Sequence, residues 1–202
     1  MTTTQSPRVQ TARVPLEHPG SLLARGLNFW TRRSYGQEME PMLALLHHRK
    51  VTTTVARFEM GVAKWSRLDT GLKELAQLSV ASQIGCSWCM DFGYYLSRTN
   101  GMPVEKLEQV VEWRGSTVYT PLERKVLEYA EAMTVTPPTV TDEMVAHLVE
   151  QLGAPAVVEL TQVVALENMY SRFNSAAGLQ SQGYSDVCEL PLAVPSGVME
   201  QT

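Results

Sequence analysis

Two cysteines separated by two residues, Cys86 and Cys89, are the part of this sequence best suited to chemistry. The thiolate is the nucleophilic form of cysteine, and an unperturbed thiol titrates only near about 8.5. Gly85 is expected to end one helix, which puts Cys86 at or next to the N-cap of the following helix and Cys89 in its first turn. Unpaired backbone N–H groups and the helix dipole favour negative charge there. The spacing therefore predicts a redox-active pair in which one sulfur attacks and the other resolves.

Three other interpretations of the pair stay open at this point. The cysteines could be small core residues, a regulatory feature without catalysis, or half of a zinc site. A zinc site needs two further ligands. The remaining candidates, Cys188 and four histidines, are scattered along the chain without a ligand spacing (His18, His47, His48 and His147). We therefore expect no metal.

Composition narrows the class of protein. The chain has 202 residues, of which 44% are hydrophobic and 19% charged, with a net charge of -4 and a pI of about 5.6. This suits one globular domain and argues against a broad basic surface for nucleic acid. No apolar run approaches the roughly 18 residues of a membrane span, and the N-terminus lacks a secretory pattern. With only three cysteines, a cytoplasmic protein without a disulfide framework is expected.

Helical periodicity and capping residues predict an all-α fold. Asp69 or Thr70 is expected to begin a helix that ends at Gly85, and Thr120 with Glu123 forms a capping-box sequence. We expect further helices near 39–46, 55–65, 86–98, 103–111, 141–153 and 155–177. Residues 1–20 and 185–202, rich in Thr, Pro, Gln or Gly, are expected to be arms that flank a helical domain at 21–184.

Glu74, followed after eleven residues by Cys86-Ser87-Trp88-Cys89, resembles the core of the carboxymuconolactone decarboxylase-like family, in particular its alkylhydroperoxidase AhpD branch. The segments 119–134 and 163–178 extend the resemblance, which covers roughly residues 40 to 180. It implies an all-α subunit that forms homo-oligomers and needs no organic cofactor. It also implies a cysteine pair that reduces a hydroperoxide, becomes a disulfide and is reduced again by a dithiol partner.

The same resemblance implies a role for each site residue. Cys89 would attack the peroxide, Cys86 would be the more exposed resolving cysteine, and Glu74 would belong to a proton relay. Two histidines of the AhpD branch are absent, because Trp88 and Gly93 stand in their positions. Histidine is the side chain best suited to move protons near neutral pH. Asp91 is therefore the candidate substitute in the sequence.

The resulting prediction is a thiol-dependent oxidoreductase, a peroxidase with an antioxidant role, that acts on a hydroperoxide or disulfide. One alternative is a decarboxylase or isomerase that uses the same pocket on a small organic acid without redox chemistry. Another is a redox sensor without turnover. We expect neither a nucleic acid nor a membrane partner. Arg172 in the last helix is expected to be paired with a carboxylate, Glu74 or Glu167.

Overall fold

The computed structural model describes residues 12–18 and 21–188, and every element in this part of the chain is a helix. The all-α prediction is confirmed. The helices are α1 (Leu22–Tyr35), α2 (Glu40–Leu45), α3 (Arg49–Val62), α4 (Thr70–Ile84), α5 (Ser87–Thr99), α6 (Val104–Glu108), α7 (Pro121–Thr134), α8 (Asp142–Leu152), α9 (Ala154–Ala177) and the 3-10 helix η1 (Ser185–Cys188).

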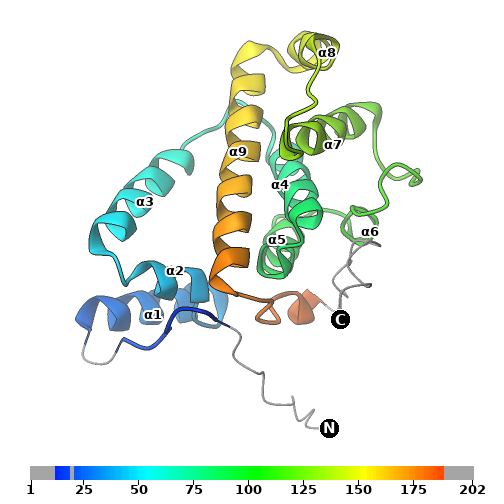
Figure 1. The fold of residues 1–202 in the computed structure, drawn as a ribbon. Coiled ribbons are helices and arrows are strands. Elements are labelled where there is room, and N and C mark those ends of the chain that lie inside the picture. Colours follow the sequence, from blue (N-terminus) through cyan, green and yellow to red (C-terminus); the bar gives the residue numbers. More distant parts are fainter. Residues whose placement is uncertain (1–11, 19–20, 189–202) are drawn as a thin grey trace, which may run out of the picture.

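The long helix α9 runs through the middle of the molecule (Figure 1). Helix α4 lies beside it and packs against α5, α7 and α9, while α8 packs on α7 and α9. Helices α1 to α3 lie on the other side of α9 from α5 and α7 (Figure 1). The hairpin of α4 and α5, with α9 against it, is the part of the fold that positions the cysteines.

Local sequence signals fix the ends of these helices. The Asp69 side chain accepts the Leu72 N–H at 3.2 Å and caps α4, which ends at Gly85 in the left-handed region with φ of 79°. Glycine suits that position because a Cβ is strained there. Thr120 and Glu123 form the predicted capping box of α7. The predicted boundaries of α4 and α9 and the predicted start of α7 are thus confirmed to within a residue or two.

Among the residues that the structure describes, the two larger of three apolar clusters hold helices α4 to α9 together. One packs α4, α7, α8 and α9 around fully buried aliphatic side chains such as Val80, Val126 and Leu160. The other surrounds the cysteine pair and includes Leu75, Leu78, Tyr94 and Trp113. Burying one such side chain contributes about 1.5–3 kcal/mol, so the cysteines lie within one of the two main sources of stability.

Part of the expected N-terminal arm packs on the helical body. Leu16 is buried, and the Arg13 N–H donates to the Ala177 carbonyl at 2.8 Å. The Arg13 guanidinium donates to two further carbonyls at the end of α9, where free C=O groups are available. The rest of the two expected arms, residues 1–11, 19–20 and 189–202, lies outside the described residues. In the described part of the chain, no helix has both the length and the apolar character that a membrane crossing requires.

Candidate active site

Cys86 and Cys89 form a disulfide at the start of α5, with Cα atoms 5.3 Å apart. Cys86 is the N-cap of α5, and its Sγ accepts the Cys89 N–H at 3.2 Å. The sequence predicts this N-cap position for Cys86, at which a backbone N–H of the first turn of α5 faces a sulfur. A thiolate at either cysteine would lie at the positive end of the helix dipole.

One prediction about the pair is wrong. The resemblance implies that Cys86 is the more exposed sulfur, but Cys86 is 2% exposed and Cys89 is 8% exposed. The reason is the tight connection at Gly85, where the Cys86 N–H donates to the Ala81 carbonyl at 2.9 Å and folds the residue back over the end of α4. Both cysteines are therefore buried, and Cys89 is the more exposed residue of the two.

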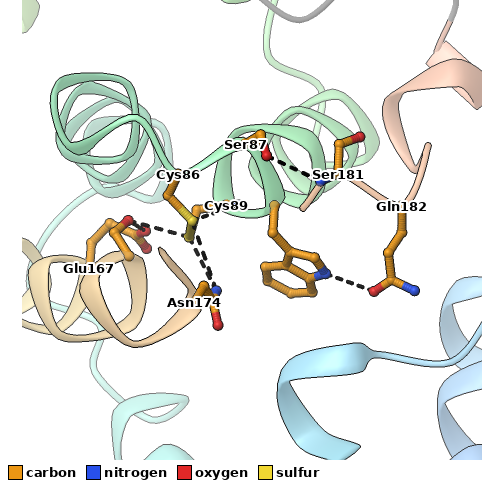
Figure 2. Close-up of a disulfide and its surroundings, with 9 residues drawn as sticks. Cys86, Ser87, Cys89, Glu167, Asn174, Ser181 and Gln182 are labelled. Carbon is orange, nitrogen blue, oxygen red and sulfur yellow. Dashed lines mark hydrogen bonds between the residues drawn. A yellow bond between two sulfur atoms is a disulfide. The ribbon is translucent and has the colours of Figure 1, made fainter. Parts of the chain in front are cut away.

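Helix α9 supplies two hydrogen-bond donors to the Cys89 sulfur (Figure 2). The Ser171 hydroxyl lies 3.3 Å from Cys89 Sγ, and the Asn174 amide nitrogen also lies 3.3 Å from it. Asn174 is 3.9 Å from Cys86 Sγ. Both α9 residues are buried. Because donors stabilise a negative sulfur, this arrangement favours Cys89 as the thiolate.

Glu167 lies one turn before Ser171 on α9, and its Oε1 is 2.7 Å from the Ser171 hydroxyl. Burial raises the pKa of this carboxyl to about 8, with a smaller upward contribution from Glu59 on α3 and a downward one from Ser171. Glu167 is therefore an acid whose proton is exchangeable near neutral pH, two hydrogen bonds from Cys89.

The structure does not bring Glu74 to the cysteines. Its carboxylate accepts a hydrogen bond from the Asn100 amide at 2.5 Å, and Asn100 caps the C-terminal end of α5. The cysteines lie at the opposite end of this helix, roughly 20 Å away along its axis at about 1.5 Å per residue. Burial raises the pKa of Glu74, while hydrogen bonds from Asn100 and Ser97 lower it. Direct proton transfer between Glu74 and Cys89 is thus not available in this arrangement.

Gly93 lies between these two ends of α5, in the position where the AhpD branch has a histidine. A Cβ on Gly93 would stand 2.9 Å from Leu78 Cδ2, and Leu78 is 1% exposed. The buried leucine fills the space that a side chain at position 93 would need. The lost histidine is thus replaced by apolar packing between α4 and α5.

Asp91, the other predicted site residue, holds a backbone segment instead of facing the sulfurs. Its carboxylate accepts the backbone N–H groups of four consecutive residues, 182 to 185, at 2.6–3.1 Å. Residues two apart on a helix do not share a face, so Asp91 points away from Cys89. We call residues 181–185 the strap. It is also fixed by Ser87, whose Oγ accepts the Ser181 N–H at 3.2 Å (Figure 2).

The aromatic residues next to the pair pack against the strap. The Trp88 indole N–H donates to the Gln182 side chain at 2.7 Å (Figure 2), and its ring stacks on Phe92 with centroids 5.0 Å apart. Phe92 also contacts Tyr184 edge-on at 5.1 Å. Trp88, in the position of the other absent histidine, therefore anchors the strap to the start of α5.

Of the four predicted site residues, only Cys86 and Cys89 meet. Sequence reasoning missed Ser171 and Asn174, and it considered Glu167 only as a partner of Arg172. Arg172 instead donates to the Thr134 carbonyl at 3.4 Å and to Asn168 Oδ1 at 3.5 Å. The available signal was the spacing of Glu167, Ser171 and Asn174, which puts three polar side chains on one face of the helix. Among the described residues, no three His, Cys, Asp or Glu side chains gather as metal ligands.

Comparison with known proteins gives a consistent relationship. Residues 49–132 match the carboxymuconolactone decarboxylase family. The chain is 33% identical to the uncharacterized protein YnjA of Escherichia coli K12 over 171 residues, which are 84% of this chain and 92% of YnjA. It is 26% identical to the uncharacterized protein YdfG of Bacillus subtilis over 57% of this chain and 79% of YdfG.

Two solved structures share the fold. The debrominase Bmp8 superposes with a TM-score of 0.74 at 17% identity, covering 90% of this chain and 97% of Bmp8. The AhpD core of a peroxidase-related protein from Ralstonia eutropha JMP134 gives 0.75 at 15% identity, covering 87% of this chain and 94% of that protein. The chain therefore belongs to the carboxymuconolactone decarboxylase family and has its AhpD-like fold.

Proposed function

We propose that this protein is a thiol-dependent oxidoreductase that reduces a hydroperoxide with the Cys86–Cys89 pair. The observation that carries the proposal is the environment of Cys89. Its sulfur lies at a helix N-terminus, within bonding distance of Cys86, and faces two donors from α9. Low-pKa thiols of catalytic proteins occupy microenvironments of this kind.

The proposed reaction has two halves. The Cys89 thiolate attacks one peroxide oxygen, the O–O bond breaks, and the alkoxide leaves and takes a proton to become the alcohol. The resulting sulfenic acid on Cys89 is attacked by the Cys86 thiol, which releases water and forms the disulfide. A dithiol reductant then returns both cysteines to thiols and is itself oxidised to a disulfide.

Thiol trapping tests this function. The reduced protein is mixed with stoichiometric cumene hydroperoxide, and the cysteines are assigned by peptide mass spectrometry, with Cys86→Ser and Cys89→Ser alongside. We expect rapid Cys86–Cys89 disulfide formation, and a sulfenic acid on Cys89 when Cys86 is replaced. If both thiols stay reduced, the hydroperoxidase function is wrong. A disulfide that forms but that no dithiol returns to thiols would instead indicate a redox sensor.

A brominated pyrrole is a useful second electrophile. A solved structure of a Bmp8 variant holds 2,3,4-tribromopyrrole, and this chain shares the fold of that protein. Reductive debromination would oxidise the two thiols to the disulfide, replace the C–Br bond by C–H and release bromide. If bromide is released in step with disulfide formation and peroxide does not react, the substrate is a halogenated compound and not a hydroperoxide. The proposed thiol chemistry of the cysteine pair would still hold.

Glu167 favours a second candidate, a proton transfer on a small organic acid without redox chemistry. A carboxyl with a pKa of about 8 is a suitable acid or base for decarboxylation or isomerisation near neutral pH. The Cys86→Ala/Cys89→Ala double variant separates the two functions. Turnover of an organic acid that survives the loss of both sulfurs would support the second candidate, whereas its loss would support the first.

We also propose that the protein is a homo-oligomer. Large apolar side chains are exposed on α1, α3 and α9 (Leu22, Leu23, Phe29, Trp30, Phe58, Met60, Val158, Met169 and Phe173). Exposed apolar patches of this kind mark protein interfaces. Light scattering coupled to size exclusion measures the assembly, and a monomer at every accessible concentration would contradict the proposal.

A further inference from the structure

A chain of two hydrogen bonds connects a buried carboxyl to the Cys89 sulfur. Glu167 Oε1 lies 2.7 Å from Ser171 Oγ, and Ser171 Oγ lies 3.3 Å from Cys89 Sγ. Ser171 is 0% exposed and Glu167 is 8% exposed. Glu167 and Ser171 are four positions apart on one face of α9. Their relative position is therefore set by the regular geometry of the helix.

The single hydroxyl hydrogen of Ser171 determines in which direction the two hydrogen bonds run. A serine hydroxyl has one hydrogen to donate and two lone pairs that accept. It cannot donate to Glu167 and to Cys89 at the same time. If Ser171 donates to sulfur, Glu167 must be the protonated acid that donates to Ser171. In the dithiol form, a Ser171 hydroxyl that donates to an ionised Glu167 can accept the S–H of Cys89.

We propose that Glu167, Ser171 and Cys89 form a proton relay, in which Glu167 receives the proton of Cys89 through the Ser171 hydroxyl. This inference rests on the proposed thiol function and deepens it. The Cys89 S–H bond breaks and its proton goes to Ser171 Oγ, while the Ser171 hydrogen moves to Glu167 Oε1. The products are a Cys89 thiolate and a neutral Glu167 acid, with no change in the number of electrons or protons in the site.

The relay replaces the proton transfer that the absent histidines would supply. Glu74 and Asp91 are engaged elsewhere, by Asn100 and by the strap. Glu167 is the carboxyl that the hydrogen bonds of the structure connect to a sulfur. Its position on α9 also differs from that of the AhpD residues, which belong to the α4–α5 hairpin in the resemblance.

The surroundings of Glu167 raise its affinity for a proton. Burial is the main cause that brings its pKa to about 8, and the neighbouring carboxylate of Glu59, on α3, adds to it. Burial also raises the pKa of Glu59 itself. A carboxyl with a raised pKa holds a proton more readily than an ordinary carboxylate, which suits Glu167 to accept one from a thiol.

The test follows the ionisation of Cys89 and needs no natural substrate. Cys86→Ser is the parent, so that Cys89 cannot form the disulfide. The rate of Cys89 alkylation by iodoacetamide is measured between about pH 6 and about pH 10, with peptide mass spectrometry separating Cys89 from Cys188. Two variants, Glu167→Gln and Ser171→Ala, are made in the parent, and Glu150→Gln, an exposed glutamate on α8, is the control.

The relay predicts a different change for each variant. Coupled groups lose protons in two macroscopic steps, so the parent profile should rise in two steps at least about one pH unit apart. Glu167→Gln should leave one step, because glutamine can donate to Ser171 but cannot titrate. Ser171→Ala removes the donor to sulfur, and alkylation near pH 7 should fall about tenfold or more, which corresponds to one unit of thiol pKa. Glu150→Gln should reproduce the parent.

Infrared difference spectra provide an independent readout in the wild-type protein. The spectrum of the disulfide form minus the dithiol form, near pH 7.5, should show a change in position or intensity of the Glu167 carboxyl band, and Glu167→Gln should remove that change. A Glu167→Gln profile and spectrum identical to those of the parent and wild type would overturn the relay. A two-step profile in a protein that ignores peroxide would overturn the hydroperoxidase function and leave the relay standing.

Discussion

Leu78 occupies the space into which a side chain at Gly93 would grow, with its Cδ2 only 2.9 Å from the place of a Cβ. The contact joins the middle of α4 to the middle of α5, between Glu74 at one end and the cysteines at the other. It explains why the Glu74 carboxylate and the thiol pair are separate features of this protein. An imidazole, which could connect them, would require the Leu78 side chain to move.

Restoring the histidine should therefore cost stability. We expect Gly93→His to lower the free energy of unfolding by about 1–3 kcal/mol, the usual cost of overpacking a core. Urea denaturation measures the change. The loss in the Gly93→His/Leu78→Ala double variant should be smaller than the sum of the losses in the two single variants, because the shorter side chain at position 78 frees the space that the ring needs. If Gly93→His is as stable as wild type, the Leu78 side chain can move aside at little cost in free energy.

Removing the charge from Asp91 should release the strap. An asparagine at this position would present an NH2 group to backbone N–H donors, and the strap residues 182–185 would lose acceptors that are buried with them. We expect Asp91→Asn to cost about 2–4 kcal/mol of unfolding free energy. Hydrogen exchange should become faster at residues 182–185.

Asp186→Asn is the matched control for the strap, because Asp186 is exposed and is the residue that directly follows the strap. It should leave both the unfolding free energy and the exchange rates close to those of wild type. Equal protection of residues 182–185 in Asp91→Asn and in wild type would show that the strap is held by its aromatic contacts and not by the carboxylate.

Glu167 should make stability depend on pH in a defined direction. Its pKa is raised from an ordinary value of 4.5 to about 8 in the folded disulfide form. Between these values the folded state binds more protons than the unfolded state, so stability falls as pH rises. The change in unfolding free energy that Glu167 causes between low and high pH is at most about 5 kcal/mol, at about 1.4 kcal/mol per pKa unit.

Urea unfolding of the disulfide form at a series of pH values measures this effect. The Glu167→Gln variant should lose less stability than wild type between about pH 5 and about pH 9, because its amide does not ionise. Parallel curves for the two proteins would mean that Glu167 ionises in the folded protein as readily as in the unfolded chain.

Glu74→Gln distinguishes the relay of the structure from the relay implied by the resemblance. A glutamine at position 74 can still accept the hydrogen bond from Asn100, so we expect a stability change below about 1 kcal/mol. In the Cys86→Ser parent, the pH profile of Cys89 alkylation should not change. A shift of that profile would show that Glu74 communicates with the thiol through contacts that the helix hairpin does not make directly.

Local signals in the sequence predict much of the fold. The ends of α4, α7 and α9 follow from Asp69, Gly85, the Thr120 capping box and Gly178, each of which acts within one turn of its own helix. Helix α1 is not among the predicted helices, and several of its apolar side chains, such as Leu22, Leu23 and Phe29, are exposed. Its caps, Ser21 and Gly36, are the usable signals.

Only the part of the candidate site that depends on residues close together in the sequence could be predicted. The position of Cys86 and Cys89 at a helix N-terminus depends on Gly85, which lies within about one helical turn of both. The partners of Cys89 depend on how α9 packs against α5, which no local pattern determines. The prediction for Asp91 is wrong for the same reason, since the strap that it holds lies 91 residues further along the chain at its first contact.

One uninterrupted helix carries Glu167, Ser171 and Asn174. This limits the insertions and deletions that this part of the chain can tolerate. Each residue of an α-helix turns by about 100°. A single residue inserted or deleted between positions 167 and 174 would rotate the members on one side away from the sulfur, whatever residue types were kept. Substitutions on the outer face of this stretch leave the alignment intact. Length changes should therefore be excluded from this segment of α9 and tolerated in the connections at its ends.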